Sequence, residues 1–101
     1  MFIQRFTLSP AFGKGRELRA LVEERVKKAQ GQGLANSLAT SMFGDVPSLV
    51  VTLRFNDLAE FEKLRAKNAA DKDWQEYVGK LNSMATVRAE LLEVIIPFPK
   101  S

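Results

Sequence analysis

The stretch that decides the fold is LVVTLRFNDLAEFEKL, residues 49–64. Within Leu49–Phe55, the side chains on one face of an extended chain are all apolar: Leu49, Val51, Leu53 and Phe55. Asp57 follows as a good N-cap, and Glu60 stands three residues later, as in a capping box. The stretch therefore predicts a strand whose apolar face packs on helices, followed by a helix over Leu58–Ala69.

The same strand and helix patterns continue on both sides of this stretch. Strands are predicted where polar and apolar residues alternate, and helices where apolar residues recur every three or four positions. The further predicted elements are strand Met1–Leu8, helix Arg16–Ala29, strand Leu34–Phe43, a hairpin turn at Gly44–Pro47, helix Asp71–Met84 and strand Glu90–Ile96. The order βαββαβ predicts an α+β fold with one four-stranded antiparallel sheet.

The final predicted strand is apolar on both of its faces. One face carries Leu92, Val94 and Ile96, and the other carries Leu91 and Ile95 with Glu93 between them. Helices on one side of a four-stranded sheet cover only one face, so something else must cover the second face. A second copy of the chain is the simplest candidate, and we therefore expect a homodimer.

Length and charge indicate one ordinary globular domain. The 101 residues carry a net charge of +3, from 15 basic and 12 acidic side chains, and we expect a single domain over residues 1–101. The two signs are interspersed, which argues against nucleic acid as a partner, since such a surface needs a one-sided basic stripe. No apolar run approaches the ~20 residues that span a membrane. The N-terminus does not have the layout of a signal peptide, so we expect a cytoplasmic protein.

Two missing residue types restrict the chemistry. The chain has no cysteine, which excludes disulfides, thiolate nucleophiles and zinc–cysteine sites. It also has no histidine, the usual general base near neutral pH and a common metal and haem ligand. We therefore expect no metal and no cofactor. Catalysis would depend on other polar side chains, on backbone groups or on the substrate itself.

The second half of the chain resembles a known group of proteins. The features that carry the resemblance are Asn56–Glu60 after an apolar strand, Asp73–Val78, the strand residues Glu90–Leu92 and the closing Pro97-Phe98. With the βαββαβ order, they resemble the ferredoxin-like dimeric α/β-barrel superfamily, and within it the NIPSNAP-like branch. The resemblance implies that two four-stranded sheets pair face to face as a barrel across a dimer, with the helices outside.

The resemblance also shows where the relatives' chemistry does not carry over. The wider superfamily includes cofactor-independent monooxygenases, haem-degrading enzymes and isomerases. Its haem-degrading members use a histidine ligand, which this chain lacks. The NIPSNAP-like strand pattern places His, Trp and Tyr at alternate positions that are here Val51, Leu53 and Phe55. A histidine-based site is therefore not inherited.

Four residues are candidates for ligand binding, and each has a structural alternative. Arg5 and Arg54 lie on strands that should be adjacent, facing away from the helices. They would bind an anion inside the barrel, or form a structural network with glutamates such as Glu93. Trp74 would line a ligand pocket or anchor a helix to the sheet. Tyr77 would donate a hydrogen bond to a substrate carbonyl, or bury its ring and leave its hydroxyl at the surface.

Two functions fit these patterns. In the first, each subunit of the homodimer binds or converts a small organic molecule that is anionic or enolisable. In the second, the chain is a non-catalytic dimerisation or interaction module, which predicts no cavity of ~300 Å³ or more. RNA binding is the weakest alternative, because the outward strand face carries Val50, Thr52 and Arg54 where such sheets place aromatic residues.

Overall fold

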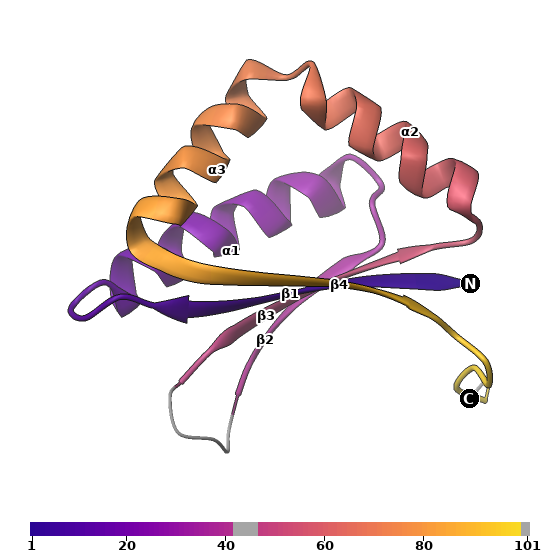
Figure 1. Ribbon diagram of the computed structural model, residues 1–101, viewed down its shortest axis with the longest axis horizontal. Coiled ribbons are helices and arrows are strands. Elements are labelled where there is room, and N and C mark those ends of the chain that lie inside the picture. Colours follow the sequence, from indigo (N-terminus) through magenta and orange to yellow (C-terminus); the bar gives the residue numbers. More distant parts are fainter. Residues whose placement is uncertain (42–46, 100–101) are drawn as a thin grey trace.

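One four-stranded antiparallel sheet with three helices on one side makes up the protein (Figure 1). The computed structural model describes residues 1–41 and 47–99. In chain order the elements are β1 (Phe2–Pro10), α1 (Gly15–Gly31), β2 (Asn36–Thr40), β3 (Leu49–Phe55), α2 (Leu58–Ala69), α3 (Lys72–Met84) and β4 (Ala85–Glu93). The strand order is β2-β3-β1-β4, so β1 and β3 lie in the middle of the sheet. The predicted α+β class is confirmed, and so is the βαββαβ order, with its second helical segment divided into α2 and α3.

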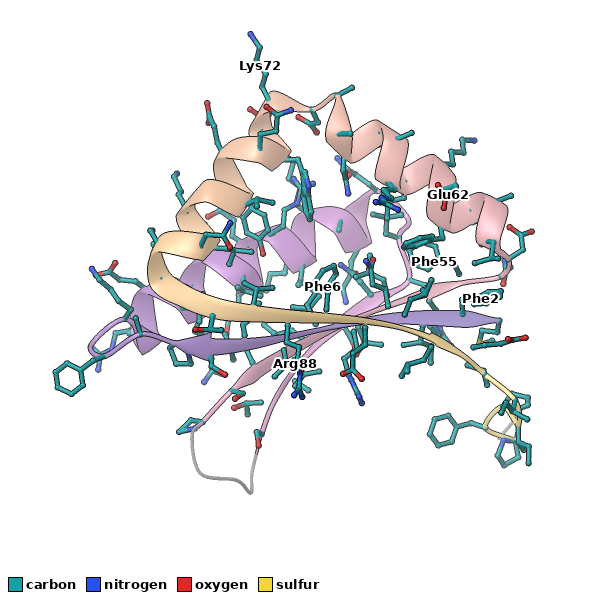
Figure 2. The ribbon with its side chains drawn as sticks, viewed as in Figure 1. Phe2, Phe6, Phe55, Glu62, Lys72 and Arg88 are labelled. Atoms are coloured by element: carbon teal, nitrogen blue, oxygen red, sulfur yellow. The ribbon has the colours of Figure 1, made fainter. Side chains whose placement is uncertain are left out.

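The strand register decides which side chains face the helices. Phe6 on β1 pairs with Val51 on β3 and with Ala89 on β4, and these positions face the helices. Their neighbours in β1, such as Arg5, face the other way and form what we call the open face of the sheet. Figure 2 shows Phe6 on the helix side of the sheet and Arg88 on the open face.

Helix α1 supplies most of the buried contact with the sheet. Its residues Leu18, Val22, Val26 and Ala29 recur at helical spacing and are buried. They pack on Leu8 and on the apolar face of β3, as the sequence predicts for that face. Helix α3 buries Leu81 alone, and none of the residues of α2 is buried. Helices α2 and α3 therefore form an arch that stands off the sheet (Figure 1).

Two aspartates set where the helices of this arch begin. Asp57 accepts a hydrogen bond from the backbone N–H of Glu60 at 2.9 Å, as predicted for the N-cap. The Glu60 carboxylate in turn accepts from the backbone N–H of Asn56 at 2.6 Å. Asp71 caps α3 by accepting from the N–H of Asp73 at 2.9 Å and of Trp74 at 3.5 Å. These caps explain the predicted break between the two helices.

The last strand starts and ends earlier than predicted. It covers Ala85–Glu93 instead of Glu90–Ile96, because β1 is its only neighbour in the sheet and fixes its length. Ala85 pairs with Pro10 at one end, and the N–H of Val94 donates to the carbonyl of Met1 at the other, at 2.9 Å. No further β1 residue remains to pair with Ile95, which is 90% exposed. Within β4, the open face carries one apolar side chain, Leu92, whereas the helix side carries Ala85, Val87, Ala89 and Leu91.

Two other predicted boundaries also move. Strand β1 continues to Pro10, two residues past its predicted end at Leu8. Strand β2 covers Asn36–Thr40, which is shorter than the predicted Leu34–Phe43. Phe43 and most of the predicted turn at Gly44–Pro47 lie outside the described residues.

Candidate functional site

A cavity of about 520 Å³ lies between the sheet and the three helices. Its sheet side is lined by apolar residues that include Phe6, Val51 and Leu53. Its helix side includes Phe61 of α2 and Trp74 of α3. The cavity exists because the arch of α2 and α3 buries so few of its own side chains against the sheet. Its volume falls in the ~300–1,000 Å³ range that is typical of ligand pockets.

A cluster of one cation and two aromatic rings forms part of the cavity wall. The rings of Trp74 and Tyr77 on α3 lie 5.4 Å apart, centroid to centroid, at an interplanar angle of 42°. The Arg25 guanidinium carbon on α1 lies 4.9 Å from the centroid of the Trp74 ring and 5.7 Å from that of Tyr77. All three residues line the cavity. Cation–π attraction thus holds a positive charge at its wall.

The hydroxyl of Tyr77 stays protonated at neutral pH. Burial in this mostly apolar environment raises the pKa of Tyr77 to about 12, and the positive charge of Arg25 opposes the shift only in part. Within residues 1–41 and 47–99, the Tyr77 hydroxyl makes no hydrogen bond to another residue. It is therefore available as a hydrogen-bond donor and is not a base at neutral pH.

Asn36 also lines the cavity, and its side chain holds a buried acceptor that is unsatisfied within the described residues. Its side-chain amide nitrogen donates to the carbonyl oxygen of Val26 at 3.5 Å. Its amide oxygen is buried and has no hydrogen-bond partner in the described part of the chain. An acceptor left in this state costs about 1–3 kcal/mol.

The structure divides the four predicted site residues between opposite sides of the sheet. Trp74 and Tyr77 lie together at the cavity, and Trp74 is half-buried there instead of forming part of the buried core. Arg5 and Arg54 lie on the open face, as the strand pairing places them. No single bound ligand in this cavity would contact both groups within one chain.

The predicted arginine–glutamate interaction involves a different glutamate. Arg5 binds the Glu90 carboxylate through two hydrogen bonds of 2.9 and 3.2 Å. Glu93, the expected partner, pairs with Phe2 in the register and therefore lies on the helix side of the sheet. The difference follows from the register, since only even-numbered positions of β4 share the open face with Arg5.

Sequence reasoning missed Arg25, Asn36 and Gln4, which also line the cavity. A signal for Arg25 was present. It lies four residues from Leu21 and four from Ala29, so it borders the apolar stripe of α1 although it is charged. A charged side chain at the edge of a buried apolar stripe indicates that it contacts a partner residue or faces a polar cavity. Gln4 carried a comparable signal, because it is the polar residue on the strand face that also holds Phe2, Phe6 and Leu8. Nothing comparable marks Asn36.

Metal and membrane sites receive no support from the described residues. Among residues 1–41 and 47–99, no group of three or more acidic side chains is arranged to hold a metal ion. None of the helices in that part of the chain has the length and apolar character needed to cross a membrane.

Comparisons with known proteins give a consistent result. The family model described as NIPSNAP matches residues 3–101. No curated protein sequence matches the chain. Among solved structures, an uncharacterized NIPSNAP domain protein from Burkholderia xenovorans superimposes with a TM-score of 0.80 at 19% identity. That match covers 99% of this chain and 100% of the other.

Two further solved structures come from proteins that are named as oxygenases. A putative antibiotic biosynthesis monooxygenase from Deinococcus radiodurans has a TM-score of 0.76 at 13% identity, covering 100% of this chain and 99% of that one. A mutant of SnoaB, a cofactor-independent oxygenase from Streptomyces nogalater, has a TM-score of 0.72 at 15% identity, covering 98% of both chains. At these identities, the similarity establishes the shared fold.

Proposed function

This chain belongs to the NIPSNAP family, and from that premise we propose that it is a homodimer that binds a small organic molecule in the cavity of each subunit. The cavity of about 520 Å³ carries the proposal. It combines an apolar lining with a few polar groups, Tyr77 and Asn36 among them, and this combination is typical of small-molecule sites.

The open face of the sheet supports the homodimer. All three helices lie on the opposite side, so no layer of the described chain covers this face (Figure 1). Ile3 and Leu92 pair on it across β1 and β4, next to the ion pair of Arg5 and Glu90. A second sheet packed face to face would bury these apolar side chains and enclose the ion pair. Arg5 and Arg54 would then belong to the subunit interface.

The chemistry of the cavity favours a ligand that is anionic or readily enolised. No aspartate, glutamate or histidine is among the described residues that line it. A substrate that must lose a proton would therefore have to supply its own acidity. Tyr77 would donate a hydrogen bond to the resulting oxyanion. Oxygenation without a cofactor, the activity named for SnoaB, is a reaction that such a site could support.

The alternative is a non-catalytic dimerisation module, which predicts a space filled by side chains. The observed cavity favours ligand binding over this alternative, because it exceeds the ~300 Å³ lower range of ligand sites.

A fluorescence titration tests the cavity as a binding site. Trp74 is the only tryptophan of the chain, so its emission reports on the cavity wall alone. Phenylbutyramide is a suitable neutral probe because its phenyl ring does not absorb where tryptophan is excited. We expect a saturable change in Trp74 emission. The change should weaken in Ala69→Phe, which fills space at the cavity, and persist in Ala66→Phe, one turn earlier on the same helix but not lining the cavity.

Two results would contradict the proposal. If the wild-type protein gave no saturable signal with either phenylbutyramide or its acid, the cavity would not be a ligand site. Independently, sedimentation that showed a stable monomer at micromolar concentration would refute the homodimer.

A further inference from the structure

The charged groups of the cavity are all positive. Among its described lining residues, Arg25 and Arg65 are the ones that carry a formal charge, and no carboxylate accompanies them. A concave, largely apolar site with one sign of charge concentrates ligands of the opposite sign. The composition of the lining therefore favours an anionic ligand over a cationic one.

Among the described residues, Arg25 is half-buried and has no acidic partner, whereas the other arginines without one, Arg16, Arg54, Arg65 and Arg88, are exposed. Arg5 binds Glu90 at 2.9 Å, and Arg19 binds Glu23 at 2.9 Å on the same helix as Arg25. Within the described residues, no carboxylate lies within 4.0 Å of the Arg25 guanidinium. Its known contacts are the faces of the Trp74 and Tyr77 rings. A half-buried cation in this position gains stability from any anion that reaches it.

The N–H groups of Arg25 donate no hydrogen bond to another described residue, so they are free to bind an anion. A guanidinium packed against an aromatic ring uses its flat face, while its N–H donors point outward in the plane of the group. That edge matches the two oxygens of a carboxylate, which accept two parallel hydrogen bonds from it. The rings also restrict the rotation of the Arg25 side chain, so less conformational entropy is lost when an anion binds.

We infer that the cavity takes an organic carboxylate, whose charged end binds the edge of the Arg25 guanidinium and whose apolar body lies on the sheet side of the cavity. This inference rests on the proposed function and adds the ligand class. Arg25 is the residue that determines specificity for the acid over neutral analogues. Its competitor is a purely structural role, in which Arg25 clamps α1 to α3 through the two rings.

A matched pair of probes separates these roles. Phenylbutyrate and phenylbutyramide share one apolar body and differ only in the charge of the terminal group. Titrated into the full-length protein with Trp74 emission as the signal, the acid should bind at least about tenfold more tightly than the amide, because hydrogen bonds to a charged group are the strong ones. In Arg25→Met, which keeps an unbranched apolar side chain, the two affinities should become equal through a loss on the acid side alone.

Two further variants complete the design. Arg65→Met removes the other cavity cation, which is exposed, and it should preserve most of the preference for the acid. Arg25→Lys keeps the charge but loses the planar fork, so an intermediate preference is expected. Circular dichroism and thermal melting show whether each variant is folded, and Arg25→Lys keeps the test available if Arg25→Met does not fold.

The outcomes are distinguishable. Equal binding of acid and amide by the wild-type protein would overturn the carboxylate inference and leave the proposed cavity intact. Loss of both probes in a folded Arg25→Met would assign Arg25 a structural role and also overturn the inference. Failure of both probes in the wild type would overturn the proposed function together with the inference.

Discussion

Replacing a core leucine of α1 and a cavity-lining leucine of α2 should separate the helix that holds the fold from the helix that covers the site. Leu18 of α1 is fully buried, with 0% of its surface exposed, and belongs to the main apolar core. Leu64 of α2 is half-buried and borders the cavity. The same change, leucine to alanine, therefore removes the same atoms from two very different environments.

The expected magnitudes follow from these environments. At Leu18 the change removes buried apolar surface and creates a new hole in a filled core, so the free energy of unfolding should fall by about 3–5 kcal/mol. At Leu64 the removed atoms border a space that is already about 520 Å³, so no new cavity has to be created. The partial loss of buried surface there should cost only about 1 kcal/mol.

Urea unfolding monitored by circular dichroism measures both values. All variants should be compared at one protein concentration, because the stability of a dimer depends on it. Equal losses of stability in Leu18→Ala and Leu64→Ala would refute the reasoning, since α2 would then contribute to the core as much as α1 does. A Leu64→Ala loss below that of Leu18→Ala, combined with a changed affinity for phenylbutyrate, would support it.

Three further changes test other parts of the structure. Val50→Asp, on the open face, should raise the dimer dissociation constant by tenfold or more in sedimentation experiments, whereas Ala66→Asp on the outer side of α2 should not; unaffected dimers in both would place the interface elsewhere. The Tyr77 phenol, followed by its ultraviolet absorbance, should ionise near pH 12 in the folded protein and near pH 10 in urea. Because folding favours the protonated form, the corresponding stability is complete below about pH 10 and is lost as the pH rises from 10 towards 12; a folded-state pKa near 10 would contradict the burial of this ring. Asp71→Ala removes the N-cap of α3 and should cost about 1 kcal/mol, with a shift in Trp74 emission that an intact first turn would not produce.

Local patterns in the sequence predicted the parts of the fold that depend on local interactions. The bounds of β3 and α2 agree with the prediction at every residue, because alternation over Leu49–Phe55 and the cap at Asp57 are complete within a few positions. The break before Trp74 was predictable for the same reason. The bounds of β4 were not, because they are set by how much of β1 is available for pairing, about eighty residues away in the chain.

The candidate site was predictable only in part, and for a related reason. Trp74 and Tyr77 were identified by residue type, but their placement opposite Arg5 depends on the face that each strand position takes in the assembled sheet. The exchange of Glu93 for Glu90 as the partner of Arg5 has the same origin. Arg25 on α1 contacts two rings on α3. The periodicity of a sequence does not predict which side chains of two different helices lie close together.

The direct junction between α3 and β4 has a consequence for how this protein can evolve. Helix α3 ends at Met84 and the strand begins at Ala85, and the N–H of Ala11 donates to the carbonyl of Met84 at 2.7 Å. There is no loop to absorb a change in length. One inserted residue would turn Val87 to the open face and Arg88 into the apolar core, since strand side chains alternate. Descendants of this sequence should therefore tolerate a substitution at this junction more readily than the gain or loss of one residue.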